Sequence, residues 1–170
     1  MKLSMNSKII AALALISLPL SLKAADGSGT ASATIIAPIT ITPVLDLAFG
    51  KMSANNGGSV VINAVTAARS VASGDSVLVN LGSTTTAATF DIAGEGNSGF
   101  DITLPAAPVD ITHTNGIDTM SVGSFTSNPS TSSALVGGAK TISVGGTLNI
   151  GASQLPGSYS GNFVVTVEYN

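Results

Sequence analysis

The side chains that could do chemistry in this sequence are few. There is one histidine, His113, and no cysteine among the 170 residues. Four acidic residues, Asp91, Glu95, Asp101 and Asp110, fall within neighbouring predicted hairpins. Without cysteine the chain can form no disulfide and no thiol nucleophile. Paired carboxylates can carry acid–base chemistry or bind calcium, but this spacing does not resemble a calcium loop. We therefore expect surface carboxylates, no enzyme, no metal and no cofactor.

A glycine-rich stretch, residues 94–99 (GEGNSG), matches the G-x-G-x-x-G pattern of dinucleotide-binding loops. In such loops a helix follows at once, because its N-terminus holds the pyrophosphate. Here the next residues, Phe100–Leu104, have the pattern of a strand. Ser98 with His113 would give two members of a serine-protease triad, but no second element of that motif is present. The stretch therefore predicts a turn between two strands.

Charge excludes one class of partner. The sequence has six basic and nine acidic side chains. Three of the basic residues lie within the first 23 residues, so the remainder carries only Lys51, Arg69 and Lys140. Three scattered cations cannot neutralise a phosphate backbone. Nucleic acid is therefore not an expected partner.

The N-terminus has the layout of a secretory signal peptide. Lys2 and Lys8 precede an apolar run, Ile9–Leu22, and a small residue, Ala24, stands at the expected cleavage site. The alternative, a membrane helix, needs roughly 18 to 20 apolar residues, and Pro19 interrupts this shorter run. We predict that residues 1–24 are removed. The rest of the chain would be exported through the periplasm to the cell surface or medium, without membrane insertion.

The exported part alternates short runs rich in Val, Ile and Thr with glycine-containing turns, which is typical of strands. Asn-Gly and Gly-Gly pairs supply the positive φ of hairpin turns, and one is predicted at Gly145-Gly146. Residues 65–75 could hold one helical turn. We predict an all-β sandwich or small barrel. The expected strands are 31–41, 44–49, 59–63, 76–80, 88–93, 100–104, 110–114, 119–125, 140–144, 147–150 and 162–169.

The first of these strands has an unusual setting. Residues 25–30 are small and polar and should form a mobile terminus. Residues 31–37 then alternate apolar odd positions with mostly hydroxylated even positions. Pro38 and Pro43 follow, and proline favours a kinked or edge position over a central strand.

The C-terminal strand has one apolar face. By the two-residue period of a strand, Phe163, Val165, Val167 and Tyr169 share a face, and Val164 is the only apolar residue on the other. Burial of each of the four stabilises a fold by roughly 1.5 to 3 kcal/mol. Something must therefore cover this strand.

The C-terminus resembles that of chaperone-usher pilus subunits. Those chains end in an alternating apolar strand with a penultimate aromatic residue, here Tyr169, and a glycine fourteen positions from the end, here Gly157. The opening of the exported chain, including Leu45–Gly50, is similar to archaic, spore-coat-U-like pilins. The chain also resembles a bacterial family of secreted domains of unknown function, which shares L-x-F-G and a closing G-x-Y-x-G-x-F-x-V-x-V-x-Y.

The resemblance implies an immunoglobulin-like β-sandwich, residues 36–170, that lacks one edge strand. A periplasmic chaperone would fill the gap first, and the N-terminal extension of a neighbouring subunit, residues 25–35, would replace it at the outer-membrane usher, which gives a homopolymer. The resemblance places Gly157, Phe163, Val165, Val167, Tyr169 and Asn170 along the groove, the last through its carboxylate. Its donor face is Gly29, Ala31, Ala33 and Ile35.

The function expected from the sequence is therefore a structural fimbrial subunit assembled by donor-strand complementation. The alternative is a self-contained surface or matrix domain that binds a partner without polymerising, with residues 31–41 completing its own fold. An enzyme or a carbohydrate binder stays a third class.

Overall fold

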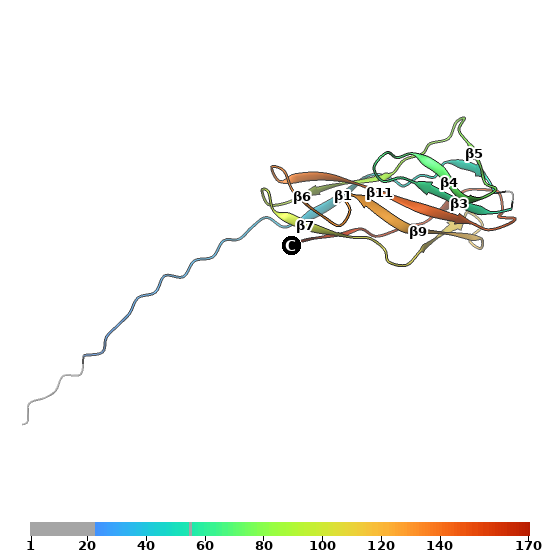
Figure 1. Cartoon of the computed structure of the whole chain (residues 1–170). Helices are drawn as coiled ribbons and strands as arrows, with labels where there is room; N and C mark the ends of the chain where they lie inside the picture. The colour runs from blue at the N-terminus through green and yellow to red at the C-terminus, as the bar shows by residue number, and fades with distance from the viewer. Residues whose placement is uncertain (1–22, 55) are drawn as a thin grey trace, which may run out of the picture. The chain divides into compact units, whose positions relative to one another are not determined.

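The computed structural model describes residues 23–54 and 56–170 (Figure 1). The chain divides into two units, residues 1–34 and 35–170. In the first unit, residues 23–34 contain no helix or strand, and every one of them is exposed. Of the predicted signal peptide, residues 1–22 lie outside the described residues.

The second unit is built from strands joined by turns and loops, and the described part of the chain contains no helix. The all-β prediction is thereby confirmed, and no described segment is a helix that could cross a bilayer. The strands are β1 Thr40–Leu45, β2 Lys51–Ser53, β3 Gly58–Ile62, β4 Arg69–Gly74, β5 Val77–Val79, β6 Ala88–Ala93, β7 Gly99–Thr103, β8 Val109–His113, β9 Thr119–Asn128, β10 Ser132–Ala134, β11 Ala139–Ile150, β12 Tyr159–Ser160 and β13 Thr166–Tyr169.

All strand pairs are antiparallel. The largest sheet runs in the order β1-β6-β11-β9-β8-β12, and β3 and β4 extend it beside β11. A second sheet has the order β10-β7-β13, and β2 pairs with β5. In Figure 1, β1, β6 and β7 lie at the end of the domain that carries the C-terminus, and β3, β4 and β5 lie at the opposite end.

The two sheets enclose one half of the core. Phe100 of β7 and Val167 of β13 pack with Ile92 of β6 and Ile142 of β11, and all four are buried. Alternation places these side chains on the inner face of each strand. The result is a β-sandwich in this half of the domain.

A second cluster fills the other half of the domain. Phe49, Val60, Val122 and Leu148 are among its buried members. Its partly buried neighbours include Met52, Val109, Ile111 and Met120. The sheet formed by β10, β7 and β13 contributes nothing to this cluster. Met52 of β2 and Leu78 of β5 pack against it instead.

Several segments differ from the sequence prediction. The predicted strand 44–49 overlaps β1 only at residues 44–45, and the predicted strand 162–169 begins only at Thr166. β11 continues through Gly145-Gly146, where a turn was expected, with a shift of register against β9 at this point. A Cβ at Gly145 would overlap the backbone of Ile62, so this glycine allows β3 and β11 to approach closely. The segment where a helical turn was possible contains β4, which pairs with β3. The predicted strand 31–41 begins only at Thr40, where β1 finds its partner β6.

Candidate functional site

Two segments of the domain lie at sheet edges: residues 40–54, which contain β1 and β2, and residues 157–170, which contain β12 and β13. Within the described residues, β1 pairs only with β6 and β2 only with β5. β12 pairs only with β8 and β13 only with β7. Each segment therefore keeps one edge outside any ladder, and such an edge can template another strand.

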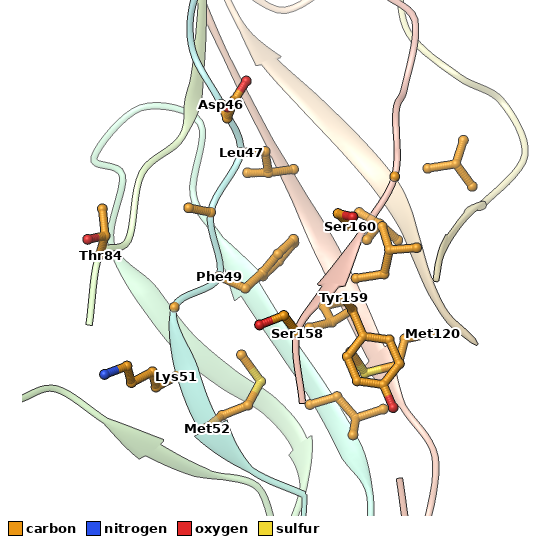
Figure 2. A pocket seen from close by; sticks show the side chains of 18 of the residues that line it. Asp46, Leu47, Phe49, Lys51, Met52, Thr84, Met120, Ser158, Tyr159 and Ser160 are labelled. Atoms are coloured by element: carbon orange, nitrogen blue, oxygen red, sulfur yellow. The ribbon is translucent and has the colours of Figure 1, made fainter. Parts of the chain in front are cut away.

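A groove of about 1350 Å³ lies between the two edge segments (Figure 2). Residues 43–54 form one side and residues 154–163 form the other. In Figure 2, Phe49 and Met52 extend from the first side, and Tyr159 and Met120 lie across from them. The floor consists of apolar side chains from β6, β8, β9 and β11, so the second core cluster reaches the surface here. These floor residues are Ala88, Phe90, Val109, Ile111, Met120, Val122, Leu148 and Ile150.

Aromatic rings attach the C-terminal segment at one end of the groove. The ring of Phe163 stacks on Phe125, with centroids 5.0 Å apart, and meets Phe90 edge-on at 6.2 Å. Such pairs add about 0.5 to 1.5 kcal/mol each beyond the burial of area. Phe90 and Phe163 also line the groove, so their rings occupy part of its width at this point.

The other end of the same side is built around Gly157. Its φ is +154°, and a Cβ at this position would overlap the ring of His113. His113 Nδ1 accepts a hydrogen bond from the N–H of Asn115 at 3.0 Å, and Nε2 lies 3.3 Å from the carbonyl oxygen of Pro156. The proton of the neutral ring is therefore assigned to Nε2 from this network. The lone histidine has a structural role here, against the main chain of the groove wall.

Tyr159 holds the loop before it. Its hydroxyl donates to the carbonyl oxygen of Leu155 at 2.7 Å and accepts from Gln154 Nε2 at 2.9 Å. Gln154 Nε2 also donates to the carbonyl oxygen of Thr119 at 3.2 Å. The ring of Tyr159 contacts that of His113, with centroids 4.8 Å apart. This side of the groove is thus tied to the β8–β9 hairpin.

Arg69, the only arginine in the sequence, holds the opposite side. Its guanidinium donates to the carbonyl oxygens of Phe49 and Lys51 at 2.8 and 2.9 Å. It also donates to the carbonyl oxygen of Val79 at 3.1 Å and to Asn80 Oδ1 at 2.9 Å. A planar fork with five N–H donors suits such a set of acceptors. Arg69 therefore fixes the bend at residues 49–51 that shapes this wall.

Gly50 is the glycine of the L-x-F-G element, and its backbone conformation explains why a glycine is needed there. Its φ is +72°, and a Cβ there would overlap Ser83 and lie 2.8 Å from the Arg69 guanidinium. Phe49 before it is buried in the second core cluster. The glycine therefore turns the chain tightly under the arginine.

Beyond Pro43 and Phe163, past the residues that line the groove, β1 and β13 approach each other. The Tyr169 hydroxyl donates to the carbonyl oxygen of Ala37 at 2.9 Å and accepts from the N–H of Glu95 at 2.6 Å. Glu95 Oε2 in turn accepts from the N–H of Ala37 at 3.1 Å. Ile39 and Ile41 pack against the first core cluster beside this contact. We call this end of the groove the closed end, and the end at Gly157 and Met52 the open end.

The sequence-predicted groove residues fall into two groups. Gly157 and Phe163 line the groove. Val165 and Val167 are buried in the first core cluster, and Tyr169 lies at the closed end. Asn170 is exposed, and its Nδ2 donates to Asp101 at 2.8 Å. The predicted donor residues are all exposed, and they are Gly29, Ala31, Ala33 and Ile35.

Three of the four carboxylates singled out in the sequence accept hydrogen bonds within the domain. Glu95 accepts from a main-chain N–H, Asp91 from Thr141 and Asp101 from Asn170. In residues 23–54 and 56–170 no three metal-ligating side chains gather in one place. Residues 94–99 form the predicted turn, between β6 and β7.

Sequence reasoning missed Arg69, Gln154 and Gly94 as parts of the site. A Cβ at Gly94 would overlap the Tyr169 hydroxyl, so this glycine belongs to the closed end. For Arg69 the sequence offers only the chemistry of the guanidinium, a planar fork of donors that can hold several acceptors at once. No local signal pointed to Gln154.

The match to known families agrees with one of the two resemblances. A domain of unknown function, DUF4402, matches residues 39–169, which include the L-x-F-G element and the closing pattern. The chain belongs to this family. No curated protein and no solved structure matches it. The expected membership of a family of domains of unknown function is confirmed, while nothing in these matches links the chain to chaperone-usher pilins.

Proposed function

We propose that this DUF4402 chain is a structural subunit of a surface fibre, in which the N-terminal extension of one copy completes the sandwich of the next. The observation that carries the proposal is the groove between two unpaired sheet edges. An inserted strand could pair with residues 43–54 on one side and residues 157–163 on the other. It would cover the apolar floor, as the second sheet does in the other half of the domain.

The direction of the inserted strand follows from the two ends of the groove. A donor copy carries its own domain directly after residue 35, and that domain needs space beyond the groove. The closed end is occupied by residues 37–41 and Tyr169 of the acceptor itself. The donor must therefore leave at the open end, antiparallel to residues 157–163.

The donor and the groove wall match in length and in taper. Residues 29–35 and 157–163 are equally long, and antiparallel pairing sets Gly29 beside Phe163 and Ile35 beside Gly157. Glycine thus lies where aromatic rings already occupy the groove. Isoleucine lies beside Gly157, which has no side chain of its own and is backed by the ring of His113. Ile35 is 97% exposed in its own domain, so its burial in the groove of another copy would favour association of the two copies.

Because the donor side chains are small, most of the binding affinity must come from hydrogen bonds of the main chain. Burial of Ile35 contributes about 1.5 to 3 kcal/mol, and Ala31 and Ala33 contribute less. Each new backbone hydrogen bond contributes about 0.5 to 1.5 kcal/mol net. Two facing edges supply many such bonds, as in other cases of strand addition. The main chain therefore dominates binding, and the side chains decide the register.

Assembly of this kind needs a carrier, because an open groove invites aggregation. In the proposal, a periplasmic chaperone occupies the groove and its basic cleft holds the Asn170 carboxylate. An outer-membrane usher then exchanges the chaperone for the next extension. A head-to-tail contact that does not close on itself yields a filament.

The test is an unboiled denaturing gel of the exported protein. We expect a ladder of polymers from the wild type. Ala33→Asp places a charge on the donor face and should leave monomer only, whereas Ser32→Asp, on the opposite face of the same segment, should keep the ladder. Deletion of residues 25–34 should give a subunit that can cap a fibre but not extend it.

The alternative function makes the opposite prediction. A self-contained surface domain would run as a stable monomer in the wild type and in both aspartate variants. It would then bind a partner without polymerising, and the proposal would be wrong.

A further inference from the structure

The root of the N-terminal extension is gripped by its own domain. Resting on the proposed function, we propose that Tyr169 and Glu95 act as positioning residues that clamp Ala37. The clamp fixes the angle at which one subunit enters the groove of the next and so makes the fibre stiff. The partner in this contact is a second copy of the chain.

The clamp satisfies both main-chain polar groups of Ala37. Its carbonyl oxygen accepts from the Tyr169 hydroxyl and its N–H donates to Glu95 Oε2. The Tyr169 hydroxyl also accepts from the N–H of Glu95, so the three residues close a ring of hydrogen bonds. A bond to a carboxylate is stronger than one between neutral groups. Pro38 follows and has a fixed φ, which stiffens the same point.

Gly94 makes room for the clamp. A Cβ at this position would overlap the Tyr169 hydroxyl and lie 3.1 Å from Leu135 Cδ1. The hydroxyl therefore sits in a recess that only glycine leaves open. Alternation along β13 would need only an apolar ring at position 169, and Phe would supply it. The hydroxyl has its use at Ala37 and Glu95, outside the core.

The clamp leaves very little free chain between two domains. Ile35 is the last donor residue and Ala37 is held, so Ile36 alone separates them. One extended residue spans at most about 3.6 Å. Successive domains must therefore lie almost in contact, and a firm root transmits the direction of one domain to the next.

Exposed apolar side chains are present at both ends that would meet. Val136 is 74% exposed, in the turn whose Gly138 accepts a hydrogen bond from Gly94 beside the clamp. Ile117 is 82% exposed, in the turn after His113 at the open end. Contact between successive domains would cover such residues.

The first test measures the clamp itself by hydrogen–deuterium exchange in full-length exported protein. In the wild type, the Ala37 amide should exchange slowly, and the amides of residues 25–34 in unassembled chains should exchange fast. Tyr169→Phe and Glu95→Ala should each speed exchange at Ala37 by about tenfold or more. Ser127→Ala, which removes another hydroxyl bonded to a carbonyl, should leave it unchanged.

The second test measures fibre stiffness in electron micrographs. Tyr169→Phe keeps the ring, so fibres should still form, but their persistence length should fall about twofold or more because the root is loose. Fibres of Ser127→Ala should match the wild type.

The outcomes separate the two proposals. A wild-type Ala37 amide that exchanges as fast as residues 25–34 in unassembled chains would overturn the clamp, and Tyr169→Phe fibres of unchanged stiffness would overturn its role in the fibre. If the wild type never polymerises, the proposed function fails and the angle between subunits fails with it, while the exchange data still decide whether the clamp exists.

Discussion

At the scale of single residues, the groove depends on side chains that hold main chain. Arg69 donates to three carbonyl oxygens and one amide oxygen, and His113 lies against the main chain at Gly157. Neither residue needs to touch an inserted strand in order to shape the site. Their loss should change the walls first.

Arg69→Lys tests the first of these contacts. Lysine keeps the charge but cannot present a planar fork, so several acceptors lose their donor. We expect the free energy of unfolding to fall by about 1 to 3 kcal/mol, measured by urea denaturation. Lys140→Ala, which removes a cation elsewhere, should change it by less than about 0.5 kcal/mol. If Arg69→Lys changes the free energy of unfolding as little as Lys140→Ala does, the positive charge of Arg69 is sufficient and its planar fork is not needed.

Gly157→Ala tests the second contact. A sparsely populated positive φ costs an L-residue about 1 to 3 kcal/mol, and at Gly157 the new methyl group also overlaps His113. Gly116→Ala is the matched control, because φ is +76° there and no atom lies within 4 Å of the added Cβ. We expect Gly157→Ala to lower stability by about 1 to 3 kcal/mol more than the control in thermal unfolding. A similar loss of stability in both variants would mean that backbone strain alone explains the effect and that the overlap with His113 adds nothing.

At the scale of elements, the side chains of the C-terminal segment alternate as the sequence pattern predicts, although the strand itself begins only at Thr166. Val165 and Val167 are buried, Phe163 and Tyr169 are half-buried, and Val164 is 72% exposed. The two-residue period alone assigns the inner face. It does not separate the half that β7 pairs with from the half that borders the groove.

Phe163→Ala and Val164→Ala compare the two faces of this element. Loss of the Phe163 ring removes its contacts with Phe90 and Phe125 and should cost about 2 to 4 kcal/mol, less than a fully buried ring would. Val164→Ala should stay within about 0.5 kcal/mol. Both values come from chemical denaturation of the purified chain. A larger loss of stability from Val164→Ala than from Phe163→Ala would mean that Val164, and not Phe163, lies on the packed face of this segment.

At the scale of the whole molecule, one half of the sandwich is closed and the other half is open. The first core cluster lies between two sheets, whereas the second is covered by the edge segments and by Leu78 of β5, and it borders the groove. Four of the floor residues, Phe90, Val109, Ile111 and Met120, are only partly buried, so covering their remaining exposed surface would be favourable.

A peptide of residues 25–36 should therefore stabilise the monomeric exported chain. Binding to the folded state raises the free energy of unfolding by about 2.7 kcal/mol at a hundredfold excess over Kd. We expect the melting temperature to rise with peptide concentration, as measured by scanning fluorimetry. The same peptide with Ala33→Asp serves as control. No shift with either peptide would indicate that the groove does not accept this segment.

The sequence by itself determined the all-β class, most strand positions and the two faces of the C-terminal segment. Hydrophobic period and turn glycines are local signals, and β6 coincides with the predicted strand 88–93 for that reason. Tertiary structure alone decided that β11 continues through Gly145-Gly146, that Arg69 grips the groove wall and that Tyr169 holds Ala37. Each of these depends on main chain far away in sequence. At Gly145, for example, the glycine marks the close approach of β3 and not a turn. The same nonlocal pairing decided which edges stay free, because an edge is defined by the strand that is missing beside it.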